Sequence, residues 1–357
     1  MSVGRLRVGI GRDDRFRRLR SASRAIILCF AAMLPVYATA GHAQDAPVRL
    51  PTAADDSPLA QLTAYYESDI PEQDQRPIEE YLPQSTTVET ITCGRRTCDP
   101  WHWQVLPEGL IYRSYLAGAK EPRIGCQWVY DYQKRWLWDI TFGGRVGILR
   151  YGNDDIIRPQ GWQIDLEGAA FPRLDMQRHP NASHSNDLVA CDYRAGIPVT
   201  YGCGRWQTKM GYYHISSHLG DEFMIRDPNY RRINYSRDSL MLGQSFYWTD
   251  DLRLYGEVAC AINPSGGALP WEFQFGIDYS PAEPSGLKPQ PFAAINAHLR
   301  EDVRFGGNLV VQAGIQWRGV TGHLFRLGLH YFNGMSDQFE FFDQYESKLG
   351  FGIWYDF

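Results

Sequence analysis

From about residue 122 onward, apolar and polar residues alternate along the chain. Residues 271–279 read Trp-Glu-Phe-Gln-Phe-Gly-Ile-Asp-Tyr, so the odd positions are apolar and the even positions are polar or glycine. Residues 308–318 and 325–331 follow the same rule. Successive side chains of a β-strand point to opposite faces, so this alternation predicts strands with one apolar and one polar face.

The alternating segments number about twelve, and an even number suits a closed single-chain barrel. Short polar or glycine-containing stretches separate them, as expected of turns between antiparallel strands. The segments are predicted at residues 122–132, 136–151, 161–171, 188–201, 205–219, 233–248, 252–263, 271–280, 291–302, 307–318, 323–333 and 346–357.

A soluble sandwich would turn the apolar faces inward, whereas a membrane barrel turns them outward to lipid. The segments are close to the 9–11 residues that a tilted spanning strand needs. The chain also ends on an alternating stretch, residues 349–357, whose last residue is Phe357, and this resembles the C-terminal signal that the barrel-assembly machinery reads. Aromatic residues lie near the strand ends, at Trp136, Trp206, Trp248, Trp271, Tyr279, Trp317, Tyr331 and Trp354.

We therefore predict an all-β fold, a closed antiparallel transmembrane β-barrel over residues 109–357. Working back from a periplasmic C-terminus, the long connections 172–187, 220–232 and 334–345 fall outside, although the long 281–290 connection falls on the inner side. The polar face contains both charge signs, which are expected to pair across a narrow interior. This favours a filled lumen and a structural or surface-interaction role.

The N-terminal part has a different character. Residues 1–43 begin with eight arginines, continue with a short apolar run and end in small residues, the pattern of a secretory signal peptide. Residues 44–108 are proline-rich and predict an irregular periplasmic segment. The net charge is already −5 and becomes more negative once the arginines are removed, which argues against nucleic acid as a partner. The expected location is the outer membrane of a Gram-negative bacterium.

Six cysteines follow the predicted cleavage site. Cys93 and Cys98 bracket four residues, a loop that one disulfide could close in an oxidising compartment. A zinc site there would need two more ligands, and His102 is the only candidate nearby. We predict the disulfide, and no metal site.

Residues 211–222 contain the one arrangement that predicts chemistry. On a strand, His214 and Ser216 share a face, with Cα atoms about 6.6 Å apart. A histidine that accepts the serine proton makes the hydroxyl a nucleophile when a third polar group holds the ring. Gln207 and Lys209 favour a lumen face for the odd positions and a lipid face for His214, but the sequence leaves both faces open.

This His-x-Ser pattern near a strand end resembles outer-membrane phospholipase A and the lipid A deacylases. The resemblance implies His214 as general base, Ser216 as nucleophile and Asn234, or alternatively Glu222, as the orienting group. Those families usually place Asn after the serine, where this chain has Ser217. The alternative function is thus a lipid acyl hydrolase, so whether the chain is an enzyme stays open. No cofactor is expected, except Ca²⁺ if the chain hydrolyses lipid.

Four arginines surround the end of the same strand, at Arg226, Arg231, Arg232 and Arg237. They are either solvated loop charges or contacts for lipopolysaccharide phosphates, which guanidinium groups bind well. The expected partners are accordingly outer-membrane lipids and lipopolysaccharide.

A longer resemblance covers most of the chain from about Gly109. Residues 109–123, 214–222, 232–237, 270–281, 292–319 and 352–357 resemble the bacterial family of unknown function DUF1207. The resemblance implies an outer-membrane barrel and names no activity.

Overall fold

The computed structural model describes residues 100–133, 135–177 and 186–357. The predicted signal peptide, Cys93, Cys98 and residues 44–99 of the predicted N-terminal segment lie outside the described residues. The described strands are β1 (His102–Val105), β2 (Ile124–Asp131), β3 (Arg135–Gly152), β4 (Gly161–Asp175), β5 (Asp187–Cys203), β6 (Trp206–Leu219), β7 (Ser236–Tyr247), β8 (Leu252–Ser265), β9 (Trp271–Tyr279), β10 (Gln290–Arg300), β11 (Gly306–Arg318), β12 (Leu324–Met335) and β13 (Tyr345–Asp356). Three short helices join them: α3 (Asp221–Arg226), η2 (Glu301–Val303) and η3 (Phe339–Phe341).

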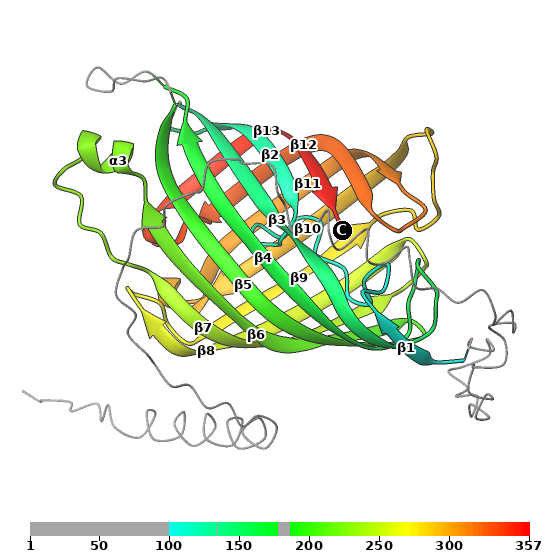
Figure 1. The fold of residues 1–357 in the computed structure, drawn as a ribbon. Helices are drawn as coiled ribbons and strands as arrows, with labels where there is room; N and C mark the ends of the chain where they lie inside the picture. The colour runs from blue at the N-terminus through cyan, green and yellow to red at the C-terminus, as the bar shows by residue number, and fades with distance from the viewer. Residues whose placement is uncertain (1–99, 134, 178–185) are drawn as a thin grey trace, which may run out of the picture. The chain divides into compact units, whose positions relative to one another are not determined.

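Strands β2 to β13 form a closed antiparallel barrel. Each strand pairs with its neighbours in sequence, and the ring closes where β13 pairs with β2, with Tyr355 opposite Ile124. Figure 1 shows this closure as the red β13 beside the cyan β2. The twelve predicted strands are confirmed, with ends that fall within four residues of those expected.

The two ends of the barrel differ. β1 pairs with the last residues of β3, so that it extends the sheet at one end, and α3 lies at the opposite end (Figure 1). We call these the β1 end and the α3 end. Loops at the α3 end include the long 220–235 connection, whereas β5 and β6 are joined at the β1 end by Gly204 and Arg205 alone. The 280–289 connection at the β1 end is the long exception that the sequence indicated.

The alternating pattern separates the outer wall from the interior. On β11 and β12, Ile315 and Leu329 are exposed on the outside, and Gln316 and Arg326 are fully buried on the inside. Trp354 lies near a strand end, as expected, but it is fully buried inside the barrel. Its neighbours Ile353 and Tyr355 take the outward positions. Its ring lies under the Arg326 guanidinium, 4.9 Å away.

Residues 109–123, the interior segment, precede β2 and are packed among inward-facing side chains. Tyr115 stacks on Tyr255 of β8, with ring centroids 3.9 Å apart, and its hydroxyl donates to Glu257 at 2.9 Å. The Leu116 amide donates to Asp278 of β9 at 3.3 Å. The interior segment therefore satisfies its polar groups with the side chains that line the barrel, as a buried backbone must.

Ion pairs attach the end of the interior segment to other parts of the ring. Lys120 Nζ lies 2.8 Å from Asp192 of β5, and Arg123 lies 3.0 Å from Asp356 of β13. Arg326 of β12 donates to Asp356 at 2.8 Å and to the Leu116 carbonyl at 3.2 Å. Contacts with strands on several sides fix the segment within the ring.

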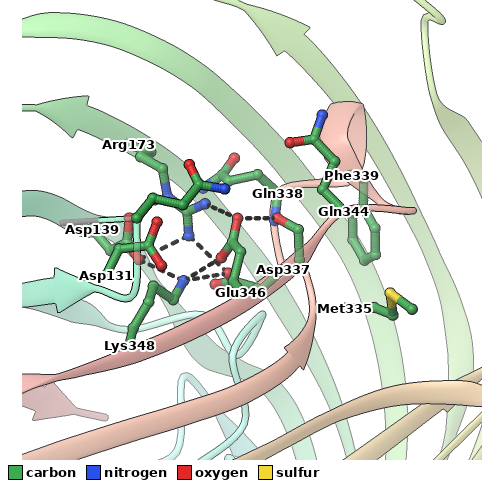
Figure 2. Close-up of polar contacts among 12 residues, drawn as sticks. Asp131, Asp139, Arg173, Met335, Asp337, Gln338, Phe339, Gln344, Glu346 and Lys348 are labelled. Carbon is green, nitrogen blue, oxygen red and sulfur yellow. Dashed lines mark hydrogen bonds and ion pairs between the residues drawn. The ribbon is translucent and has the colours of Figure 1, made fainter. Parts of the chain in front are cut away.

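A second polar cluster lies nearer the α3 end (Figure 2). Arg173 of β4 donates to Asp139 and to Glu346, with its Nη1 2.6 Å from Glu346. Lys348 Nζ lies 2.8 Å from Asp337 and 3.1 Å from Asp139. Opposite charges from β3, β4, β13 and the 336–344 loop are thus interleaved, so each buried charge has partners that offset its loss of hydration.

Candidate active site

His214 and Asp238 form the centre of a polar site on the outer wall of the barrel. The register of β6 and β7 places these two residues directly opposite each other. The distance between His214 Nδ1 and Asp238 Oδ1 is 2.8 Å. A carboxylate only accepts hydrogen bonds, so Nδ1 is the protonated nitrogen and Nε2 is left as the basic one.

Two further side chains hold the Asp238 carboxylate. The Tyr212 hydroxyl donates to Oδ1 at 2.6 Å, and Asn263 Nδ2 of β8 donates to Oδ2 at 3.0 Å. Three donors on two flanking strands therefore fix the carboxylate that orients the His214 ring. This is the support that a general base needs if its ring is to keep one tautomer and one direction.

A β-bulge brings Asn263 into this position. The β7–β8 register shifts so that Asp238 pairs with Asn263 while Ser239 pairs with Ala261. Ile262 is the extra residue, and both it and Asn263 are exposed on the outside. Without the bulge, strict alternation would turn one of these two consecutive side chains inward, so the bulge directs the amide toward Asp238.

Ser216 lies two residues along β6 on the same outward face as His214. Its neighbours Ile215 and Ser217 are buried on the inside. On the two neighbouring strands, Ser216 pairs with Ser236 of β7 and with Tyr193 of β5. His214 is bonded to Asp238, and within the described chain the Ser216 hydroxyl forms no hydrogen bond with His214 or with any other residue. The outward orientation that Gln207 and Lys209 favoured is the one observed.

The wall around the three polar residues is apolar. Large side chains are exposed on β5, β7 and β8 beside them, and a chain of methylene groups could lie against this surface. They are Tyr193, Ile197, Leu242 and Ile262.

The carboxylate that contacts the His214 ring belongs to Asp238, which was not among the site residues predicted from the sequence. Asn234 is exposed in the turn before β7, at a φ of 53°, and has no hydrogen bond to His214. Glu222 is exposed in the first turn of α3. Asp238 has the parity of the outward-facing positions of β7, so it lies on the same side of the wall as His214. What the sequence lacked was the register across the long loop between β6 and β7.

A family model for a protein of unknown function, DUF1207, matches residues 59–357. The chain belongs to the DUF1207 family. A search of curated proteins finds no match to this DUF1207 chain.

Solved structures similar to the DUF1207 barrel are outer-membrane barrels with low sequence identity. Outer membrane phospholipase A from Escherichia coli is 10% identical, with a TM-score of 0.43 over 66% of this chain and 90% of the other. The phospholipase of Salmonella typhi, solved as a dimer with bound calcium, is 12% identical, with a TM-score of 0.44 over 69% and 91%. A mutant Rhodopseudomonas blastica porin is 9% identical, with a TM-score of 0.24 over 66% and 99%.

The four arginines expected to contact lipopolysaccharide, Arg226, Arg231, Arg232 and Arg237, do not form one cluster in this DUF1207 chain. Arg237 of β7 points into the barrel, is fully buried and lies 3.0 Å from Glu272. Its guanidinium is therefore inaccessible from outside the barrel, so the expected contact of Arg237 with lipopolysaccharide is wrong. Arg226 is paired with Asp187 at 3.3 Å and with Asp227 at 3.0 Å. Arg231 and Arg232 are exposed.

The described residues contain no group of three His, Cys, Asp or Glu side chains that could hold a metal ion. Among the described cysteines, Cys126, Cys191 and Cys260 are free, whereas Cys203 is disulfide-bonded. The predicted Cys93–Cys98 disulfide stays a prediction. No helix in the described part of the chain is both long and apolar enough to cross a membrane.

Proposed function

We propose that this chain is an outer-membrane lipid acyl hydrolase that works from the lipid-facing wall of its barrel. The observation on which the proposal rests is the hydrogen bond of 2.8 Å between His214 Nδ1 and Asp238, with Ser216 two residues away on the same outward face. A serine, a histidine and a carboxylate in this order are the parts of a nucleophilic acyl-transfer site.

The chemistry follows from the three groups. His214 Nε2 accepts the Ser216 proton as Oγ attacks the ester carbonyl, and Asp238 stabilises the imidazolium through Nδ1–H. The tetrahedral intermediate collapses as the bond to the leaving alcohol breaks, and the imidazolium returns its proton to that alcohol. Water, deprotonated by His214, then attacks the acyl-serine and releases the fatty acid and free Ser216.

The position of the site supports a membrane lipid as substrate. Tyr193 and Ile262 are exposed there. The acyl chains of a membrane lipid would pack against them and leave the ester near the polar rim, whereas a small soluble ester has no such chains. The acyl-transfer steps use the chain's own residues alone. The fatty-acid release assay is run with and without Ca²⁺ to test whether the activity depends on that ion.

The contacts of the interior segment favour a second, compatible role. Because Tyr115, Leu116, Lys120 and Arg123 bond to the ring on several sides, we propose that the lumen is filled and that the barrel does not conduct. If the wild type shows no catalysis, a structural or surface-interaction role is the candidate that this packing favours. Single-channel recording in planar bilayers tests the filled lumen, because stable ion conductance of the folded barrel would contradict it.

Fatty-acid release tests the catalytic proposal. Refolded barrel, checked by heat-modifiable gel mobility, is mixed with phospholipid and with lipopolysaccharide, with and without Ca²⁺. We expect release by the wild type and by Ser236→Ala, a matched control on the same face, and none by Ser216→Ala. Equal release by the Ser216 variant, or none by any folded protein, would contradict the proposal.

A further inference from the structure

Arg231 and Arg232 differ from Arg226 and Arg237 in having no acidic partner within the described chain. Arg226 and Arg237 are neutralised by Asp187, Asp227 and Glu272. Within the described chain, Arg231 and Arg232 form no ion pair, and both are exposed. Their charges therefore face the surroundings of the barrel uncompensated.

A hydrogen bond holds Arg232 close to the site. Its Nη2 lies 2.8 Å from Nδ1 of His218, which accepts the bond because a guanidinium can only donate. His218 is exposed on the outward face of β6, two residues beyond Ser216, so their Cα atoms are about 6.6 Å apart. The His218 ring in turn lies edge-on to Tyr193, with centroids 5.7 Å apart. The guanidinium is thus held on the rim side of Ser216, with most of its donors unused.

We propose that Arg232, with Arg231 beside it, binds the phosphate of the lipid whose ester lies at Ser216. The inference rests on the proposed function and specifies its substrate as an acyl lipid with a phosphate in its headgroup region. In such a lipid the ester lies deeper and the phosphate nearer the aqueous rim, the same order as Ser216, His218 and Arg232 along the wall. A guanidinium fork matches two phosphate oxygens, which gives it both charge and direction.

The source of the phosphate is a phospholipid headgroup or the phosphorylated sugar of lipopolysaccharide, which share this chemistry. Neutral diacylglycerol has the ester without the phosphate, and inorganic phosphate has the charge without the acyl chains. Comparison of these four probes separates a lipid-phosphate site from a general ester site and from a general anion site.

The first measurement is binding, made on Ser216→Ala so that no turnover is needed. Arg232→Gln in this background is expected to weaken binding of short-chain phosphatidylglycerol or of lipopolysaccharide about tenfold, the loss of one charge-assisted hydrogen bond. Arg304→Gln is the matched control, because Arg304 is also exposed at the α3 end but lies between β10 and β11. Binding of diacylglycerol should not change. Equal weakening by both variants, or binding of inorganic phosphate as tight as that of the phospholipid, would overturn the inference.

The second measurement is kinetic and separates this inference from the catalytic proposal. On phospholipid, Arg232→Gln should raise KM about tenfold with kcat within about twofold, whereas on diacylglycerol both constants should be unchanged. One outcome is hydrolysis that depends on Ser216, is as fast on diacylglycerol as on phospholipid and is unaffected by Arg232→Gln. That outcome would overturn the phosphate site but not the proposed hydrolase activity. Phosphate-dependent binding without any hydrolysis would support the phosphate site and overturn the proposed hydrolase activity.

Discussion

Asn263 stands directly opposite Asp238 because β8 has one extra residue, Ile262, at that point of the barrel. The amide donates to Asp238 Oδ2 at 3.0 Å, while Oδ1 is left to Tyr212 and His214. Bulges interrupt a strand ladder, and the interrupted ladder here is the one beside the polar site. The local irregularity thus positions an amide against the side chain that holds the His214 ring.

Asp238→Asn is expected to reduce kcat for fatty-acid release by about 10³- to 10⁴-fold with little change in KM. An amide nitrogen facing Nδ1 favours the wrong histidine tautomer and cannot stabilise the imidazolium. Asn263→Ala is the control, since it removes a donor to the same carboxylate and leaves the His214 bond, and it should cost less than about tenfold. An Asp238→Asn barrel with nearly normal kcat would show that the carboxylate has no part in catalysis.

Arg326→Met is expected to lower the free energy of unfolding by about 3–5 kcal/mol. The guanidinium is fully buried and bonds Asp356, Gln312 and the Leu116 carbonyl, so its removal leaves a buried carboxylate with fewer partners. Arg205→Met at the exposed β1-end turn should change stability by no more than about 0.5 kcal/mol. Urea titration of the folded barrel in detergent measures both. Similar values for the two variants would mean that the interior segment contributes little to stability.

Stability is expected to fall at acidic pH through Asp337, in the loop between β12 and β13. Burial alone would raise its pKa, but Lys348 and Arg173, each 2.8 Å away, outweigh burial and hold the pKa well below its usual value. A carboxyl group with a lowered folded-state pKa stabilises the fold above its unfolded pKa, about 3.9, and this contribution disappears as the pH falls below that value.

The matched variants are Asp337→Asn and Asp343→Asn, the latter at an exposed position in the same loop. At neutral pH, Asp337→Asn should be less stable than the wild type. The difference should shrink as the pH is lowered from about 5 to 2, whereas Asp343→Asn should follow the wild type. Parallel stability curves for all three proteins would exclude Asp337 as a source of the pH dependence.

The strands could be predicted from the sequence because one face of each is apolar, and that alternation also fixes which side chains face outward. Gln207 and Lys209 correctly indicated that His214 faces away from the interior. The same rule, applied to Arg237 in the predicted strand 233–248, predicts the burial that is observed, which is at odds with its expected contact with lipopolysaccharide.

Asp238 could not be predicted as the partner of His214, since the pairing depends on how the long loop between β6 and β7 sets the register. The bulge at Ile262 leaves no mark on the alternation, because residues 258–262 are all apolar. Local pattern thus determined the faces of strands, and loops and bulges determined which residues meet across them.

Covalent labelling tests the central claim most directly. A fluorophosphonate with a long alkyl chain reacts with an activated serine by forming an Oγ–P bond and releasing fluoride. We predict a single adduct, located at Ser216 by peptide mass spectrometry, which persists in Ser236→Ala, forms far more slowly in Asp238→Asn and is absent in Ser216→Ala. A folded wild-type barrel that stays unlabelled, or an adduct on another serine, would contradict the assignment of Ser216 as the nucleophile.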